Sequence, residues 1–205
     1  MFKFYPEYSS KYFIIFITAF IISLVAGCGN NLPVKKNLRT SFQLVNQDSS
    51  KVIFPDDFKG DITVMSFIYT NCPDICPLTT NNLQMIQQQI KKDNINGVQF
   101  LELSFDPDRD TPSILKKYAG VRGIDIKNFQ FLTGNKKVID SLLKEMNIYA
   151  IPTDTIRYNN GGGFTYSFIH TDRITLIDRQ SRIRKEYKGS TVDQKEIIDD
   201  IKTLE

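Results

Sequence analysis

The sequence predicts an α/β fold in which strands and helices alternate along the chain. Ile62–Tyr69 is a continuous apolar, β-rich run, and Val98–Leu103 is a second, mostly apolar run, as expected for buried central strands. A turn with Cys72 and Pro73 follows the first run and leads into a helical pattern, and the chain closes with a β-hairpin and a helix. These features define a thioredoxin-like plan, here with an additional N-terminal β-hairpin and a long inserted loop before the C-terminal hairpin.

The other strands are predicted from short β-rich segments separated by turn residues. Asp48-Ser49-Ser50 and Arg179-Gln180-Ser181 each separate two such segments and so predict two hairpins. The segments are Phe42–Asn46 and Lys51–Phe54 for the first hairpin, Phe129–Leu132 for a single short strand, and Arg173–Asp178 and Arg182–Tyr187 for the second hairpin.

Helices are predicted where apolar residues recur at helical spacing and a capping residue comes first. Thr111 followed by Pro112 is typical of an N-cap and a first helical turn. The predicted helices run from Leu78 to near Asn96, from Pro112 to Ala119, from Lys136 to Met146, and from a cap at Thr191 to Leu204.

One long segment, Asn147–Phe168, shows neither the helical spacing of apolar residues nor the alternation of a strand, and we expect it to be an irregular insertion. It contains Gly161-Gly162-Gly163, which predicts local flexibility. Loops of this length often carry function, so a lid or a partner-recognition loop is a hypothesis for this segment.

Composition limits the functions that the chain can have. It has 205 residues, with 26 basic and 23 acidic side chains and a net charge of +3, which is too near neutral to indicate a nucleic-acid groove. Three cysteines cannot all pair within one chain. A single histidine excludes sites that need two imidazoles, such as HExxH zinc sites.

The N-terminus has the order of a secretory signal. Lys3 and Lys11 precede the apolar run Phe13–Val25, which is shorter than the ~20 residues of a spanning helix. Leu24-Val25-Ala26-Gly27-Cys28 resembles the lipobox of bacterial lipoproteins, in which the signal is cut before a cysteine that then carries lipid. An uncleaved anchor helix is the alternative, and either interpretation places the domain outside the cytoplasm. We expect a signal at 1–27, a lipidated N-terminus and tether at 28–39, and the folded domain at 40–205.

Cys72 and Cys76 are the candidate reactive pair. They lie where the first central strand leads into a helix, and a helix N-terminus stabilises a thiolate. Three intervening residues, rather than the two of thioredoxin, give a wider bite that suits a soft metal ion as well as a disulfide. A purely structural disulfide is the alternative for an exported protein.

His170 is the only imidazole, and it ends the inserted segment just before the C-terminal hairpin. In a thioredoxin-like fold this position lies against the cysteine turn. His170 could therefore complete a Cys72–Cys76–His170 site, whose sulfur and nitrogen ligands suit Cu(I) and can also hold Cu(II).

The acidic loop Asp106–Asp110 resembles a calcium loop only superficially. Pro107 and Thr111 stand where an EF-hand does not accept them, so an EF-hand is rejected. The loop is interpreted as a turn and helix cap, or as a carboxylate source that tunes the nearby thiols or guides a partner. Thr133-Gly134-Asn135 is interpreted as a turn and cap rather than a phosphate loop.

Four features of the sequence are distinctive in combination: Cys72-Pro-Asp-Ile-Cys-Pro77, Leu103-Ser-Phe-Asp-Pro-Asp-Arg-Asp-Thr-Pro112, Phe131-Leu-Thr-Gly134, and His170 before Leu176-Ile-Asp178. Together they resemble the Sco/SenC family over about residues 42–202. The resemblance implies a thioredoxin-like fold, copper held by Cys72, Cys76 and His170, and a role in cytochrome c oxidase assembly. Two departures are noted: Phe105 stands where relatives often have a small aliphatic residue, and no acidic residue directly precedes His170.

Two functions stay open from the sequence. The first is a metallochaperone, a binding protein that is not an enzyme, which delivers copper to the binuclear copper centre of cytochrome c oxidase. The second is a thiol–disulfide reductase in which Cys72 and Cys76 keep the cysteines of that centre, or of another exported cuproprotein, reduced. The expected protein partner is the copper-bearing oxidase subunit or another exported cuproprotein. A lipid on Cys28 is expected to hold the chain at the extracytoplasmic face of a bacterial membrane. We expect a monomer that binds no nucleic acid. A peroxiredoxin is disfavoured, because Met65 and Tyr69 occupy the positions of its Pro and Thr.

Overall fold

The computed structural model describes residues 32–153, 156–157 and 164–205. The expected signal, the lipobox with Cys28, and Gly161–Gly163 lie outside the described residues. Among the residues that are described, no helix is both long and apolar enough to cross a membrane.

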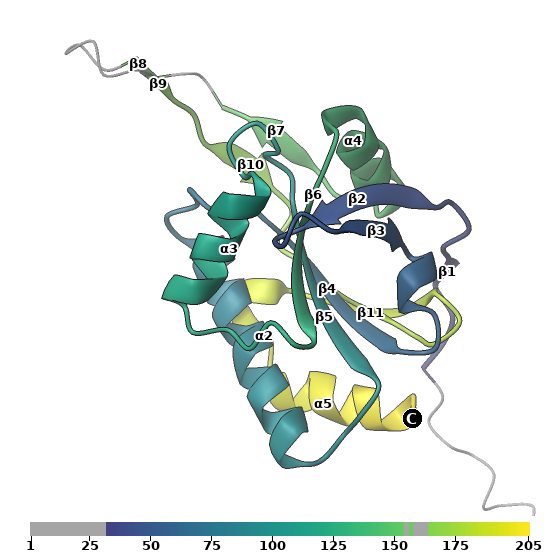
Figure 1. Ribbon diagram of the computed structural model, residues 1–205. Coiled ribbons are helices and arrows are strands. Elements are labelled where there is room, and N and C mark those ends of the chain that lie inside the picture. The colour runs from purple at the N-terminus through teal and green to yellow at the C-terminus, as the bar shows by residue number, and fades with distance from the viewer. Residues whose placement is uncertain (1–31, 154–155, 158–163) are drawn as a thin grey trace, which may run out of the picture. The chain divides into compact units, whose positions relative to one another are not determined.

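An eight-stranded sheet forms the centre of the domain (Figure 1). Three neighbouring strands, β4, β5 and β6, are parallel, and every other pairing in this sheet is antiparallel. All seven residues of β4 are buried, as the continuous apolar run predicts for a strand covered on both faces. In sheet order the strands are β1 (Lys36–Asn37), β12 (Arg182–Tyr187), β11 (Ile174–Ile177), β4 (Ile62–Ile68), β5 (Val98–Ser104), β6 (Phe129–Thr133), β2 (Phe42–Asn46) and β3 (Lys51–Phe54).

Helices cover both faces of the sheet. Figure 1 shows α2, α3 and α5 on one side and α4 on the other. Right-handed crossovers from β4 to β5 and from β5 to β6 place α2 and α3 on the same face. Single 3₁₀ turns occur at Asp56–Phe58 and Gly189–Thr191. The helices are α2 (Ile75–Lys92), α3 (Pro112–Val121), α4 (Lys136–Glu145) and α5 (Gln194–Thr203).

The helix caps confirm some sequence predictions and correct one. Thr111 precedes α3 with Pro112 in the first turn, although its side chain makes no cap hydrogen bond. Asn135 caps α4 by accepting from the backbone N–H of Lys137. The predicted cap at Thr191 is wrong: Thr191 belongs to a 3₁₀ turn, and the side chain of Asp193 caps α5 instead.

The inserted segment is more regular than the sequence predicts. Strand β7 (Ala150–Pro152) pairs with β10 (Phe168–His170), and β8 (Ile156–Arg157) pairs with β9 (Phe164–Thr165). Figure 1 shows β8 and β9 continuing the same ribbon beyond β7 and β10. Strands this short have no measurable period, so their backbone pairing could not be detected in the sequence.

The folded unit begins before the expected start at Thr40. Strand β1 pairs with β12, and the backbone N–H of Leu38 donates to Ser181. Farther towards the N-terminus, Nε of Arg184 donates to the carbonyl of Leu32 at 2.9 Å. Part of the expected tether therefore belongs to the edge of the sheet.

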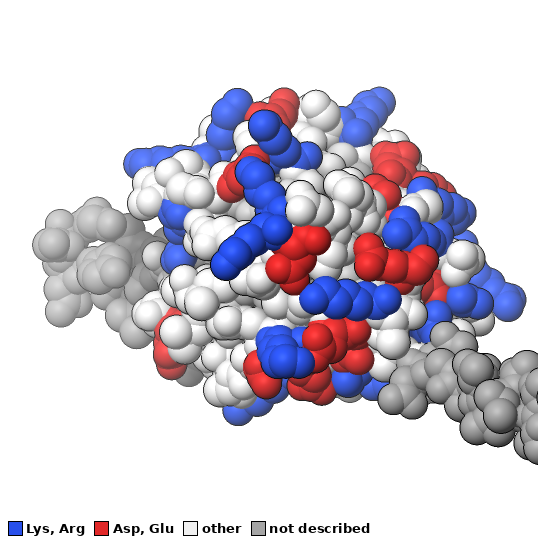
Figure 2. Space-filling model, turned by 90° about the horizontal axis from the view of Figure 1, so that it is seen from below, with Lys and Arg blue, Asp and Glu red and all other residues white. Residues whose placement is uncertain are grey.

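Charges of both signs are interspersed on the face shown in Figure 2. Pairs such as Lys185–Asp200 at 2.6 Å and Lys202–Asp93 at 3.0 Å join opposite signs across neighbouring elements. Exposed pairs of this kind contribute at most about 1 kcal/mol each. This face presents no continuous field of one sign.

Candidate metal centre

The cysteines lie at the carboxyl end of the central parallel strands. Strand β4 ends at Ile68, Cys72 lies three residues before α2, and Cys76 is the second residue of that helix. Strand β5 ends beside it at Ser104 and continues into the acidic loop Asp106–Asp110. The parallel register therefore brings the cysteine turn and the acidic loop together, since carboxyl ends of neighbouring parallel strands meet at one edge.

The structure brings all three predicted site residues together. The Nε2 atom of His170 is 4.0 Å from Sγ of Cys72 and 3.7 Å from Sγ of Cys76. These three atoms lie within 4.8 Å of one another, and both cysteines are free thiols. The backbone N–H of Cys76 donates to Sγ of Cys72 at 3.4 Å, which holds the Cys72 sulfur at the start of α2. Cys76 is buried, whereas Cys72 and His170 are partly exposed.

A backbone carbonyl orients the imidazole. Nδ1 of His170 lies 3.1 Å from the carbonyl oxygen of Thr171, which can only accept a hydrogen bond, so Nδ1 carries the proton and Nε2 presents its lone pair to the sulfurs. The pairing of β10 with β7 places His170 opposite Ala150 and fixes the backbone around it. The acidic neighbour that the sequence lacks is therefore not needed for this orientation.

An aromatic wall supports the imidazole from the protein side. The ring of Phe105 lies 5.1 Å from that of His170, and the ring of Tyr69 lies 6.1 Å away at an edge-on angle of 83°. Phe168 packs edge-on against both Phe105 and Tyr69. Phe105 is 1% exposed. The residue noted in the sequence as a departure thus forms part of the site, a role that no sequence pattern indicated.

Burial dominates the electrostatics of Cys76. Removal from water raises the pKa of the Cys76 thiol far above its usual value, and the nearby Cys72 and Glu102 raise it further. The predicted stabilisation of a thiolate by the helix N-terminus is therefore outweighed at Cys76. A metal ion that binds this sulfur must displace its proton.

Asp110 fixes the cysteine turn to the neighbouring strand. Its buried carboxylate accepts hydrogen bonds from the backbone N–H of Thr70 at 3.0 Å, from the Thr70 hydroxyl at 2.5 Å, and from the Ser104 hydroxyl at 2.5 Å. Among the described contacts, this carboxylate reaches neither thiol. The acidic loop positions the cysteines through the backbone, a role that the sequence interpretation missed.

A second contact of the acidic loop holds the segment that carries His170. The hydroxyl of Tyr166 donates to the buried carboxylate of Asp106 at 2.7 Å, and the guanidinium of Arg109 lies 3.3 Å above the Tyr166 ring. Nη1 of Arg109 also donates to the carbonyl of Tyr166. These contacts tie the chain four residues before His170 to the loop that follows β5.

The three donor atoms have the chemistry of a soft-metal site. Two sulfurs and one imidazole nitrogen suit Cu(I) and can hold Cu(II), whereas a structural zinc site normally has four protein ligands. Within the part of the chain that the structure describes, Cys72, Cys76 and His170 are the only such group of metal-ligating side chains. The donor set therefore fits copper.

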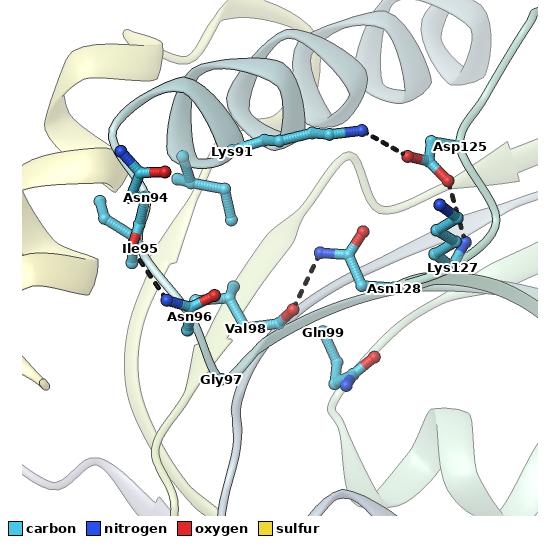
Figure 3. Close-up of a pocket in the computed structure, with 11 residues that line it drawn as sticks. Lys91, Asn94, Ile95, Asn96, Gly97, Val98, Gln99, Asp125, Lys127 and Asn128 are labelled. Atoms are coloured by element: carbon cyan, nitrogen blue, oxygen red, sulfur yellow. Dashed lines mark hydrogen bonds and ion pairs between the residues drawn. The ribbon is translucent and has the colours of Figure 1, made fainter.

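A separate cavity of about 410 Å³ lies far along α2, at its C-terminal end. Figure 3 shows polar side chains beside apolar ones such as Ile95, with Lys91 paired to Asp125 at 2.9 Å and Asn128 bonded to the carbonyl of Val98. Its lining contains no cysteine or histidine. It lies at the amino end of β5, opposite the edge that carries the cysteines, and adds nothing to the metal centre.

The fold and the site together define a thiol- and imidazole-bearing domain of thioredoxin type. The family model described as SCO1/SenC matches residues 30–205. The chain belongs to the SCO1/SenC family.

Solved structures of similar proteins agree with this assignment. A SCO1/SenC family lipoprotein from Bacillus anthracis is 31% identical, covers 84% of this chain and 96% of its own, and has a TM-score of 0.71. ScoI of Bradyrhizobium japonicum, solved with copper bound, is 28% identical, covers 80% and 98%, and has a TM-score of 0.67. BsSco, a member of the Sco family of cytochrome c oxidase assembly proteins in which a disulfide switch was identified, is 28% identical, covers 84% and 95%, and has a TM-score of 0.68. The predicted thioredoxin-like fold is confirmed.

The role of Asp110 predicts the effect of removing its charge. Asp110→Asn keeps the size of the side chain but loses one acceptor, so it should lower the free energy of unfolding by ~1–3 kcal/mol, measured by urea denaturation. Amide hydrogen exchange at Thr70–Cys72 should accelerate more than exchange in β4. Asp108→Asn, an exposed position in the same loop, is the control and should change stability by less than ~0.5 kcal/mol. Equal effects of the two variants would contradict this role.

Proposed function

We propose that this protein binds copper through Cys72, Cys76 and His170 and delivers it to the binuclear copper centre of cytochrome c oxidase. The observation that carries the proposal is the convergence of two thiols and one imidazole nitrogen within 4.8 Å. The set joins distant parts of the chain, since His170 lies 94 positions after Cys76 and 98 positions after Cys72.

Unequal exposure of the three ligands suits transfer of a metal cargo. Cys76 is 1% exposed, whereas Cys72 and His170 are partly open to solvent. An acceptor thiolate can therefore approach the metal from the side of Cys72 and His170, and ligands can be exchanged one at a time. The buried Cys76 is the last to release the ion and regains its proton when it does, because burial favours the neutral thiol.

Two relatives support this proposal. Copper is bound in the solved structure of Bradyrhizobium japonicum ScoI, and BsSco is described as a member of a family of cytochrome c oxidase assembly proteins. The donor set of this chain has the chemistry that such a role needs.

Copper binding predicts a specific loss on removal of the imidazole. Anaerobic titration of the full chain in detergent with Cu(I), against a competing chelator, should show one tight equivalent. His170→Ala should weaken this affinity at least tenfold, because one of three ligands is lost. Cys28→Ser, which keeps Cys72 and Cys76, is the control and should retain the equivalent. Unchanged Cu(I) affinity in His170→Ala would show that His170 is not a ligand.

A second candidate function is reduction of disulfides in a copper-site protein. The free thiols of Cys72 and Cys76 lie within 4.8 Å, so a small approach of the sulfurs closes a disulfide. The partly exposed Cys72 would attack a client disulfide, and Cys76 would then displace the client thiol, so that two electrons and two protons pass to the client. The disulfide switch identified in BsSco favours such chemistry.

The reductase function predicts a trapped intermediate. In a single-turnover reaction with the oxidised copper-bearing domain of the oxidase subunit, Cys76→Ala should accumulate a mixed disulfide through Cys72 and release no reduced client. His170→Ala should reduce the client at nearly the wild-type rate, since sulfur exchange needs only the two thiols. Non-reducing gels and mass spectrometry follow both species. If wild-type protein leaves the client oxidised, this function is excluded while copper delivery stands.

We also propose that Cys28 carries lipid and holds the domain at the extracytoplasmic face of a bacterial membrane. The lipobox-like sequence before Cys28 motivates this proposal, and the similar Bacillus anthracis protein is described as a lipoprotein. Only residues 29–31 separate Cys28 from Leu32, whose carbonyl is bonded to Arg184.

Lipidation is tested by metabolic labelling. Wild-type protein expressed in a bacterium should incorporate radiolabelled palmitate and sediment with membranes. Cys28→Ser should lose the label, because the thiol that accepts the lipid is gone. Cys72→Ser is the matched control and should keep the label. Label that persists in Cys28→Ser would reject Cys28 as the attachment site.

A further inference from the structure

A carboxyl group lies buried beneath the helix that carries Cys76. Glu102, in the middle of β5, is 0% exposed. Ser66 on β4 donates to its Oε1 at 2.8 Å, and the Thr80 hydroxyl lies 3.1 and 3.0 Å from its two oxygens. Thr80 stands one helical turn after Cys76 on α2. Neither the copper ligation nor the thiol exchange described above uses this carboxyl.

The surroundings of Glu102 contain hydroxyls but no cation in contact. Tyr118 on α3 lies 3.2 Å from the Thr80 hydroxyl, and no ion pair to Glu102 occurs among the described residues. Arg122 is the charged group that lowers the pKa of Glu102, and Glu102 in turn raises the pKa of Tyr118 and of Cys76. Burial raises the pKa of Glu102 to about 7, against the lowering effect of its hydroxyl donors and of the more distant Arg122.

The charge of the metal centre depends on the oxidation state of copper. Two thiolates and Cu(I) sum to −1 (−2 + 1), whereas two thiolates and Cu(II) sum to zero (−2 + 2). An ionised Glu102 beside the Cu(I) form would place two negative charges in one poorly solvated region. Like charges that interact in this way raise the pKa of the group that can still accept a proton.

We propose that Glu102 takes up one proton when Cu(I) binds, so that the loss of its own negative charge compensates for the charge of −1 on the Cu(I) centre. This inference rests on the proposed copper site. In the balance, each Cu(I) displaces the thiol protons of its ligands, the Glu102 carboxylate accepts one proton, and solvent receives one proton fewer than without Glu102. When Cu(II) binds, the centre is neutral and Glu102 takes up no proton.

The hydroxyls provide a route for this proton. Tyr118, with Thr70 and Arg122, lines an open surface cavity of about 620 Å³. A proton that enters there can pass from the Tyr118 hydroxyl to the Thr80 hydroxyl and on to Glu102, over successive oxygen–oxygen distances of 3.2 and 3.0 Å. Each hydroxyl accepts one proton and donates another, so both hydroxyls are neutral again after the transfer.

The test compares the pH dependence of Cu(I) affinity in wild-type protein and Glu102→Gln. Both should bind one equivalent. Protons from the ligands cancel in the ratio of the two affinities, so this ratio isolates Glu102. Below about pH 7 Glu102 is already protonated, so the Cu(I) affinity of Glu102→Gln divided by that of wild type should be constant. Above about pH 7 this ratio should rise by up to tenfold per pH unit, because only wild type must take up a proton. The corresponding ratio of Cu(II) affinities should not change with pH.

Infrared difference spectra of the wild type provide a test that needs no variant. At about pH 8, Cu(I) loading should produce the C=O stretch of a buried protonated carboxyl, and this band should be absent from Glu102→Gln. Glu196→Gln, on the exposed surface of α5, is the control and should follow wild type in both measurements. A flat Cu(I) ratio, or a missing carboxyl band, overturns the role of Glu102. Absence of Cu(I) binding by wild type would instead reject the copper site itself.

Discussion

The joining of two parallel strand ends by the buried carboxylate of Asp110 is the constraint on which the metal centre depends. Strands β4 and β5 run side by side and end at the same edge, and the chain then departs as the cysteine turn and the acidic loop. Asp110 connects them by accepting from Thr70 on one side and Ser104 on the other. An ionised carboxylate tolerates burial only when such donors surround it, so the two loops hold each other in one geometry.

The histidine is delivered from the opposite direction by a different set of contacts. Pairing with β7 positions strand β10, and the contacts of Tyr166 with Asp106 and Arg109 hold the chain just before this strand. Asp106 and Asp110 belong to the same loop, so one short segment after β5 positions both the cysteine turn and the histidine strand. The contacts of the acidic loop therefore help to set the distances between the two cysteine sulfurs and the histidine nitrogen.

Sequence alone predicted the central strands and helices and the cysteine turn, because each of these carries a local signal. A continuous apolar run defines β4, and Cys72 and Cys76 with their prolines mark the turn that follows it. The placement of His170 followed from topology rather than from its neighbours. The pairings of β1, β7 and β10 were missed because strands of two or three residues show no period. The carbonyl of Thr171 that orients His170 was equally hidden, since every residue has one.

The electrostatic features that the sequence did not reveal arise from burial, which cannot be read from neighbouring residue types. A helix N-terminus predicts a thiolate at Cys76, yet removal from water reverses that preference. Glu102 is buried without a cation in contact, and it lies close enough to Cys76 to raise the pKa of that thiol. A site that is dry on its protein side must balance each change of charge locally. In the role proposed for Glu102, the oxidation state of a bound metal is sensed through charge as well as through ligand geometry.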